Sequence, residues 1–122
     1  MNEPPRVENA HLHIEQIDGL VAAAGVDGTR EILDAFWRST TNLMEQLTEQ
    51  VSQNTLDLAA QTAHAVKGSA ANIGALRLSN TATEFENACK RADLDAAKTA
   101  LQSLQQDYID VKGHFEEHLS KA

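Results

Sequence analysis

The stretch AHAVKGSAANIGA, residues 63–75, decides how this chain is interpreted. Alanine dominates it, and alanine has the highest helix propensity of all residues. A helix is therefore predicted over about 55–72, and Gly74 is expected to end it. The same helix carries an imidazole at His64 and an ammonium group about one turn later at Lys67. A helix that looks built for packing thus has two chemically active groups among its smallest residues.

The spacing within this helix places His64 on the solvent side. Each helical residue is rotated by about 100° from the last, so Val66 and Ile73 lie within about 20° of the pole opposite His64. That pole is expected to face the core, with Leu58, Ala59 and Ser69 flanking it. The residues predicted to surround the imidazole are Asp57, Ala60, Gln61, Lys67, Gly68 and Ala71. Glycine destabilises a helix interior, so Gly68 indicates that space is kept for another macromolecule beside His64.

The rest of the chain repeats apolar residues at helical spacing. The predicted helices cover about 14–24, 27–51, 55–72, 75–90 and 94–119, with Asp27, Asn54 and Asp93 as N-caps. Both prolines lie in the first five residues, and no run of alternating β-branched residues suggests a strand. Short connections between long helices imply antiparallel neighbours. The predicted fold is all-α: an antiparallel up-down-up-down four-helix bundle with a short additional N-terminal helix, spanning residues 11–120 after a flexible N-terminal lead at 1–10.

Length and charge limit the functions that this chain can have. Its 122 residues suit one domain. Ten Lys and Arg residues against 18 Asp and Glu residues give a net charge of -8, which disfavours nucleic acid and an anionic membrane surface as partners. The single cysteine, Cys89, excludes an intrachain disulfide and is typical of a reducing compartment. Without an apolar run or a signal-peptide pattern, the sequence predicts a cytoplasmic protein.

An exposed imidazole is a competent nucleophile near neutral pH, because its ordinary pKa of about 6.5 leaves much of it neutral. Attack of His64 on a phosphoryl group would give a phosphohistidine. Such transfer depends on in-line positioning and on stabilising the phosphoryl oxygens. Lys67, on the same side of the helix, is placed to neutralise an anion on the ring.

Residues 64–75, HAVKGSAANIGA, resemble the histidine-containing phosphotransfer (HPt) family, whose motif reads His-x-hydrophobic-Lys-Gly-small-small followed by Gly after a short spacer. The matching residues are His64, Val66, Lys67, Gly68, Ser69, Ala70, Ile73, Gly74 and Ala75. The number and lengths of the predicted helices extend the resemblance over about 14–119. Glu86 also lies where this family often carries a Glu, on the helix after the motif helix.

The resemblance implies that His64 is the phosphoacceptor, that Lys67 stabilises the phosphoryl group and that Gly68 gives the partner access. Ser69 would allow close packing or a hydrogen bond. The remaining candidates for a supporting role are Gln61, Ala71, Glu86 and Lys90. Lys90 is the weakest of them, because basic residues at a helix end usually complement the helix dipole in solvent. The residues leave open which imidazole nitrogen reacts, and the family points to Nε2.

The resemblance also implies partners. The phosphoryl group would come from an aspartyl phosphate in the receiver domain of a hybrid histidine kinase or response regulator, and would pass to a second receiver. No cofactor of its own is expected, and Mg²⁺ would come with the receiver. Because the chain begins at Met1 and ends soon after its last helix, we expect a stand-alone protein. It is expected to be a monomer and a phosphocarrier without independent kinase activity.

Three other interpretations account less well for the sequence. A sensor histidine kinase also exposes a helical His, but nothing here resembles a nucleotide-binding motif. A metal site is suggested by His114 and His118, four residues apart, with His11 and His13 as further candidates, but no third convergent ligand is evident. A purely structural bundle would use Gly68 for helix packing, whereas Gly68 lies only about 40° from His64 on the wheel, away from the apolar stripe.

Overall fold

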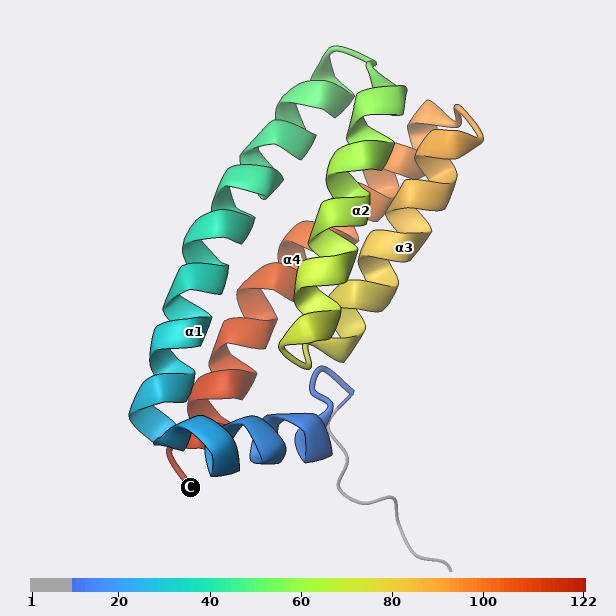
Figure 1. The fold of residues 1–122 in the computed structure, drawn as a ribbon. Coiled ribbons are helices and arrows are strands. Elements are labelled where there is room, and N and C mark those ends of the chain that lie inside the picture. Colours follow the sequence, from blue (N-terminus) through green and yellow to red (C-terminus); the bar gives the residue numbers. More distant parts are fainter. Residues whose placement is uncertain (1–9) are drawn as a thin grey trace, which may run out of the picture.

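Helices make up nearly all of the described chain. The computed structural model describes residues 10–122, so the predicted lead at 1–10 lies, except for Ala10, outside the described residues. Within that range the helices are α1 (Ile14–Ser52), α2 (Leu56–Asn72), α3 (Leu76–Lys90) and α4 (Leu94–Leu119). They pack in the cyclic order α1, α2, α3, α4, each antiparallel to the next (Figure 1). The predicted all-α bundle is confirmed.

The predicted short N-terminal helix is the first part of α1. The N-cap predicted at Asp27 is wrong, because that residue lies inside α1, where the helix has already resumed after Gly25. Gly25 interrupts the helical backbone with φ 79° and ψ 169°, a conformation that glycine adopts at little cost. The Thr29 hydroxyl donates a hydrogen bond of 2.7 Å to the Gly25 carbonyl just after this break. As Figure 1 shows, the segment before Gly25 lies across one end of the bundle, and the segment after it runs along the bundle.

The turns at the other end of the bundle use left-handed backbone conformations. Asn54 has φ 57°, and the N-cap of α2 is Thr55, so the cap predicted at Asn54 is wrong. Asparagine takes this conformation more readily than most residues, which suits Asn54 to the turn itself. The cap predicted at Asp93 is confirmed, because its carboxylate accepts a hydrogen bond from the backbone N–H of Ala96.

The core runs along the axis between the helices. Its largest fully buried side chains are Ile17, Leu47, Val66, Leu78, Phe85, Leu104, Val111, Phe115 and Leu119. On α2 the buried sector is not centred opposite His64 as the wheel predicted. Leu58, expected beside the core, is 50% exposed, whereas Ala60, expected beside His64, is 7% exposed. α2 packs against both α1 and α3, and most extensively against α3, so its buried sector is turned toward that neighbour.

The N-terminal segment holds the turn between α2 and α3. The backbone N–H of His13 donates to the Gly74 carbonyl at 2.8 Å, and the Gln16 side-chain amide donates to the carbonyls of Ala71 and Asn72 at 2.9 and 3.0 Å. Gly74 has φ 83°, and a Cβ there would lie 3.0 Å from Cγ1 of Ile17. The C-terminal end of the helix that carries His64 is thereby fixed by residues far away in the sequence.

Candidate functional site

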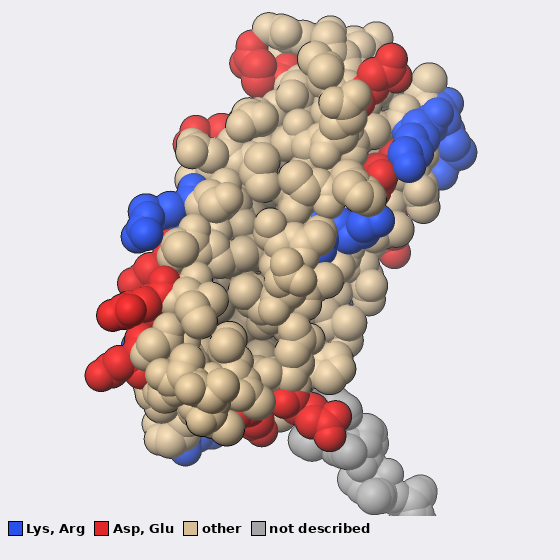
Figure 2. Space-filling model, in the orientation of Figure 1, with Lys and Arg blue, Asp and Glu red and all other residues tan. Residues whose placement is uncertain are grey.

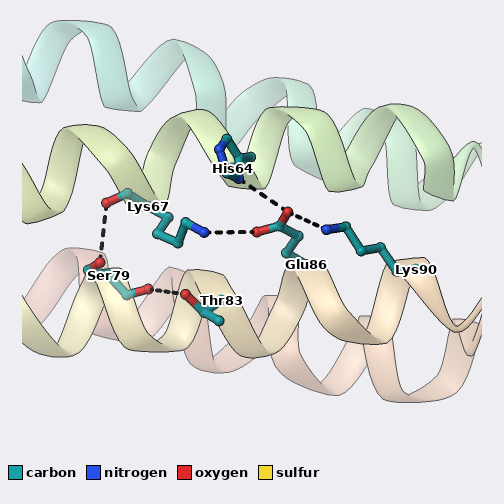
Figure 3. Close-up of polar contacts among 6 residues, drawn as sticks. All are labelled: His64, Lys67, Ser79, Thr83, Glu86 and Lys90. Atoms are coloured by element: carbon teal, nitrogen blue, oxygen red, sulfur yellow. Dashed lines mark hydrogen bonds and ion pairs between the residues drawn. The ribbon is translucent and has the colours of Figure 1, made fainter.

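The imidazole of His64 projects from the middle of α2 with 65% of its side chain exposed. Its Nδ1 atom lies 3.2 Å from Oε2 of Glu86, which comes from the adjacent helix α3 (Figure 3). The Glu86 side chain is only 6% exposed. The exposure predicted for His64 is confirmed, and the structure adds a buried carboxylate behind the ring.

Three basic groups surround the Glu86 carboxylate. Besides His64, the Lys90 ammonium lies 3.0 Å from Oε2, and the Lys67 ammonium lies 3.7 Å from Oε1. Burial by itself would raise the pKa of Glu86, but the hydrogen bond and charge of Lys90, the charge of Lys67 and the hydrogen bond from His64 outweigh it, so the pKa is lowered. Glu86 is therefore ionised at neutral pH, as a buried charge with several partners can be.

An ionised Glu86 determines the tautomer of His64. A carboxylate can only accept hydrogen bonds, so the bond between the two side chains requires the proton to be on Nδ1. In a neutral imidazole, the other nitrogen, Nε2, then carries the lone pair. The contact with Glu86 is the ring's only hydrogen bond to the described part of the chain. The nitrogen that points away from α3 is thus the nucleophilic one.

The predicted neighbours of His64 on α2 fall into two groups. Gln61, Gly68 and Ala71 are exposed, and a Cβ built at Gly68 would meet no atom within 4 Å. Packing within residues 10–122 does not account for the glycine. Lys67 is half-buried with 33% of its side chain exposed, because it leans over α3 toward Glu86. Ser69 is half-buried at the margin of the core.

The polar residues of α3 that face this site are Ser79, Thr83, Glu86 and Lys90, which repeat at intervals of four, three and four residues (Figure 3). That spacing puts them along one face of the helix. The Ser79 hydroxyl donates a 3.2 Å hydrogen bond to the backbone carbonyl of Lys67 on α2. Sequence reasoning missed Ser79, and this spacing was the only signal for it. Lys90, expected to be a solvated helix-end cation, pairs with Glu86 while its side chain stays 62% exposed.

The face over α1 and α2 beside the site is poor in charge. In the view of Figure 2 this face is mostly uncharged, basic side chains gather toward α3, and the outer edge of α1 carries acidic side chains together with basic ones. No helix within residues 10–122 is long and apolar enough to cross a membrane.

The remaining histidines serve contacts at the end of the bundle near the N-terminal segment. The rings of His11 and His114 stack with centroids 4.2 Å apart, and Nε2 of His118 lies 2.7 Å from the Asp18 carboxylate. Nδ1 of His13 accepts a hydrogen bond from the backbone N–H of Gln16. The described residues contain no group of three or more His, Cys, Asp or Glu side chains that could hold a metal ion.

Cys89 is buried next to the site on α3. Burial, and after it the charge of Glu86, raises the pKa of its thiol to about 11. A thiol that stays protonated is a poor nucleophile. Cys89 therefore packs in the core.

Comparisons with known proteins point to one family. The sequence model of the Hpt domain matches residues 31–114. Histidine-containing phosphotransfer protein 1 of Arabidopsis thaliana is 25% identical over 103 residues, which cover 83% of this chain and 67% of that protein.

Solved structures give the same result for the fold. Histidine-containing phosphotransfer protein B of Pseudomonas aeruginosa aligns with a TM-score of 0.83 at 20% identity, over 94% of this chain and 99% of that one. The phosphotransfer protein MtHPt2 of Medicago truncatula aligns with a TM-score of 0.82 at 25% identity, over 92% of this chain and 80% of that one.

Proposed function

Because this chain belongs to the Hpt domain family and acts in histidine phosphotransfer within a phosphorelay, we propose that His64 is the residue that carries the phosphoryl group. The observation that supports this assignment is the pairing of an exposed imidazole with a buried, ionised carboxylate. Nδ1 of His64 lies 3.2 Å from Glu86, and the opposite side of the ring is open to solvent. A partner can reach Nε2 without any movement of the bundle.

The transfer step follows from this tautomer. The Nε2 lone pair attacks the phosphorus of an aspartyl phosphate in a receiver domain, forming the N–P bond as the P–O bond to the aspartate breaks. The aspartate leaves as a carboxylate with the electron pair of the broken bond. The imidazole becomes a phosphoimidazolium that keeps its proton on Nδ1, where the Glu86 carboxylate faces the new positive charge. The reverse reaction passes the group to a second receiver.

Lys67 acts on the phosphoryl group itself. Its ammonium lies 3.7 Å from Glu86, which is longer than a hydrogen bond, and a third of its side chain remains exposed. The long, flexible stem can therefore swing toward oxygens bound at Nε2, where an ammonium stabilises their charge. Lys90 is already engaged by Glu86 at 3.0 Å and serves mainly to keep that carboxylate ionised.

Gly68 and Ala71 give the partner room beside His64. A receiver must bring its aspartyl phosphate within bonding distance of a ring that lies close to the helix backbone. Open space around Gly68 and the exposed methyl of Ala71 allow that approach, and the weakly charged face over α1 and α2 suits a docking surface. Ser69 has a packing role at the edge of the core.

The protein we propose is a cytoplasmic, monomeric phosphocarrier that does not phosphorylate itself. Its partners are the receiver domains of a hybrid histidine kinase and of response regulators. Mg²⁺ is supplied by the acidic pocket of the receiver, and the carrier needs no cofactor. A purified chain incubated with ATP and Mg²⁺ should remain unlabelled, and label would appear only after a phosphorylated receiver is added.

The decisive experiment is transfer of radiolabelled phosphate from a phosphorylated receiver to His64→Gln. This variant should keep the helical circular dichroism spectrum and accept no label. His118→Gln is the matched control, because it removes a different imidazole, in the last turn of α4, whose hydrogen bond is to Asp18. This variant should be labelled like the wild type. Acid-labile label on His64→Gln would rule out the assignment.

A further inference from the structure

We propose that Ser79 is a positioning residue for phosphotransfer, whose hydroxyl holds α3 in the axial register that lets Glu86 reach His64 and Lys67 together. The proposal rests on the function assigned above to His64. Ser79 touches neither the imidazole nor the Lys67 ammonium; it acts through the relative placement of two helices.

The contact that carries the proposal joins the two helices of the site. The half-buried Ser79 hydroxyl donates to the backbone carbonyl of Lys67 at 3.2 Å. Glu86 lies two turns farther along the same face of α3, opposite His64 (Figure 3). Ser79 and Glu86 are therefore two points at which α3 binds α2, one through the backbone and one through side chains.

Register matters because the contacts of Glu86 are near their distance limits. The bond to Nδ1 of His64 is 3.2 Å, and the separation from the Lys67 ammonium is 3.7 Å. A slide of α3 by a single residue would be about 1.5 Å, enough to break a hydrogen bond of this length. Even a fraction of that slide would bring Glu86 closer to one of His64 and Lys67 and move it away from the other.

The apolar contacts of α2 specify this register weakly. Its buried residues are Leu56, Ala59, Ala60, Thr62, Ala63, Val66 and Ala70. Four of these seven are alanine, so much of the buried surface is made of single methyl groups. Apolar burial is non-directional and changes little when such a surface slides. A hydrogen bond to a backbone carbonyl is directional and supplies the missing constraint.

Thr83 provides a matched control one turn away. Its hydroxyl donates to the Ser79 carbonyl at 3.1 Å, a bond within α3 that makes no link to α2. Ser79→Ala and Thr83→Ala each remove one hydroxyl hydrogen bond from the same face of the same helix. Only the first removes a tie between the helices. Ser79→Ala is expected to fold, because alanine has a higher helix propensity than serine.

The test is the initial rate of phosphate uptake from a phosphorylated receiver. Ser79→Ala should slow uptake by about two- to tenfold, the range that the net free energy of one hydrogen bond spans as a ratio of rates. Thr83→Ala should leave the rate within experimental error of wild type. Ser79→Thr, which keeps a hydroxyl at this position, should restore most of the lost rate.

A second readout separates positioning from a general loss of stability. If Ser79 acts by placing Glu86, then Ser79→Ala should cause no further slowing in a Glu86→Gln background. Equal uptake rates for Ser79→Ala and Thr83→Ala would overturn the proposal. So would a Ser79→Ala substitution that slows uptake by the same factor in the wild-type and Glu86→Gln backgrounds. Failure of wild-type protein to accept label on His64 would instead refute the proposed function, so the two failures are distinguishable.

Discussion

The carboxylate of Glu86 lies 3.2 Å from Nδ1 of His64, on the side of the ring opposite the nitrogen that faces solvent. The carboxylate is buried and the imidazole is exposed, so the pair connects the interior of the bundle with its surface. Glu86 thereby sets the tautomer of the ring and is placed to stabilise the positive charge that phosphorylation creates. The first prediction concerns this contact.

Replacing Glu86 should slow transfer, and the effect should be larger when the new side chain provides neither the negative charge nor the hydrogen-bond acceptor. A hydrogen bond to a charged group contributes about 1.5–3 kcal/mol, so Glu86→Ala should reduce the rate of phosphate uptake by about tenfold or more. Glu86→Gln keeps an acceptor for the Nδ1 proton but loses the charge, and its rate should lie between those of alanine and wild type. Rapid-quench transfer assays measure these rates. If Glu86→Ala is as fast as wild type, the contact does not contribute to catalysis.

Substitutions of Lys67 and Lys90 should slow transfer to different extents, although both side chains pair with Glu86. Lys67→Ala removes the cation that can reach the phosphoryl oxygens and should slow transfer while the bundle stays folded. Lys90→Ala removes only a partner of Glu86 and should have the smaller effect. Measuring transfer rates and circular dichroism for both variants checks this order. An unchanged rate in Lys67→Ala would remove that residue from the mechanism.

Matched substitutions at Gly68 and Gly113 should separate effects on stability from effects on phosphotransfer. Both are exposed helical glycines where a Cβ would meet no atom of the described residues within 4 Å. Alanine at either position should therefore raise the free energy of unfolding by about 0.5–1 kcal/mol. Chemical denaturation measures this gain.

A longer side chain at the same two positions tests access to the ring. Gly68→Gln should slow phosphotransfer by obstructing the receiver, whereas Gly113→Gln, on α4, should not. Equal transfer rates for the two glutamine variants would show that Gly68 is not needed for access.

Stability should fall in mildly acidic solution because of His11. This side chain is 8% exposed, and burial, followed by the charges of His114 and Arg77, lowers its pKa despite the opposing charges of Asp107 and Asp110. The unfolded chain then binds a proton at higher pH than the folded one. The contribution of His11 is constant above about pH 6.5 and declines as the pH falls below that value toward the lowered pKa.

Denaturant unfolding at pH 7.5 and pH 5.5 measures this dependence. His11→Gln should lose less stability between the two pH values than wild type does. The lowered pKa of Glu86 keeps its carboxylate ionised at both pH values. Glu86→Gln should therefore leave the difference in stability between pH 7.5 and pH 5.5 unchanged. A His11→Gln variant with the same pH dependence as wild type would contradict the prediction.

The local sequence specified much of this architecture. Helical periodicity predicted each helix to within one or two residues of its observed ends, and the break at Gly25 is where the sequence placed it. The wheel was right about His64 and Gly68 but wrong about Leu58 and Ala60. Periodicity states which residues share a face; it does not state how far that face turns toward each of two neighbouring helices.

What the sequence by itself determined is therefore the helix that presents His64, Lys67 and Gly68 on one open face. These three residues lie within five positions, and a helix of fixed pitch leaves no other arrangement for them. What only the tertiary structure decided is the second half of the site: the burial of Glu86, its pairing with His64 on α2, and the bond from Ser79 to α2. Those contacts join helices whose register depends on how all the side chains between them pack, and that register is a property of the assembled bundle.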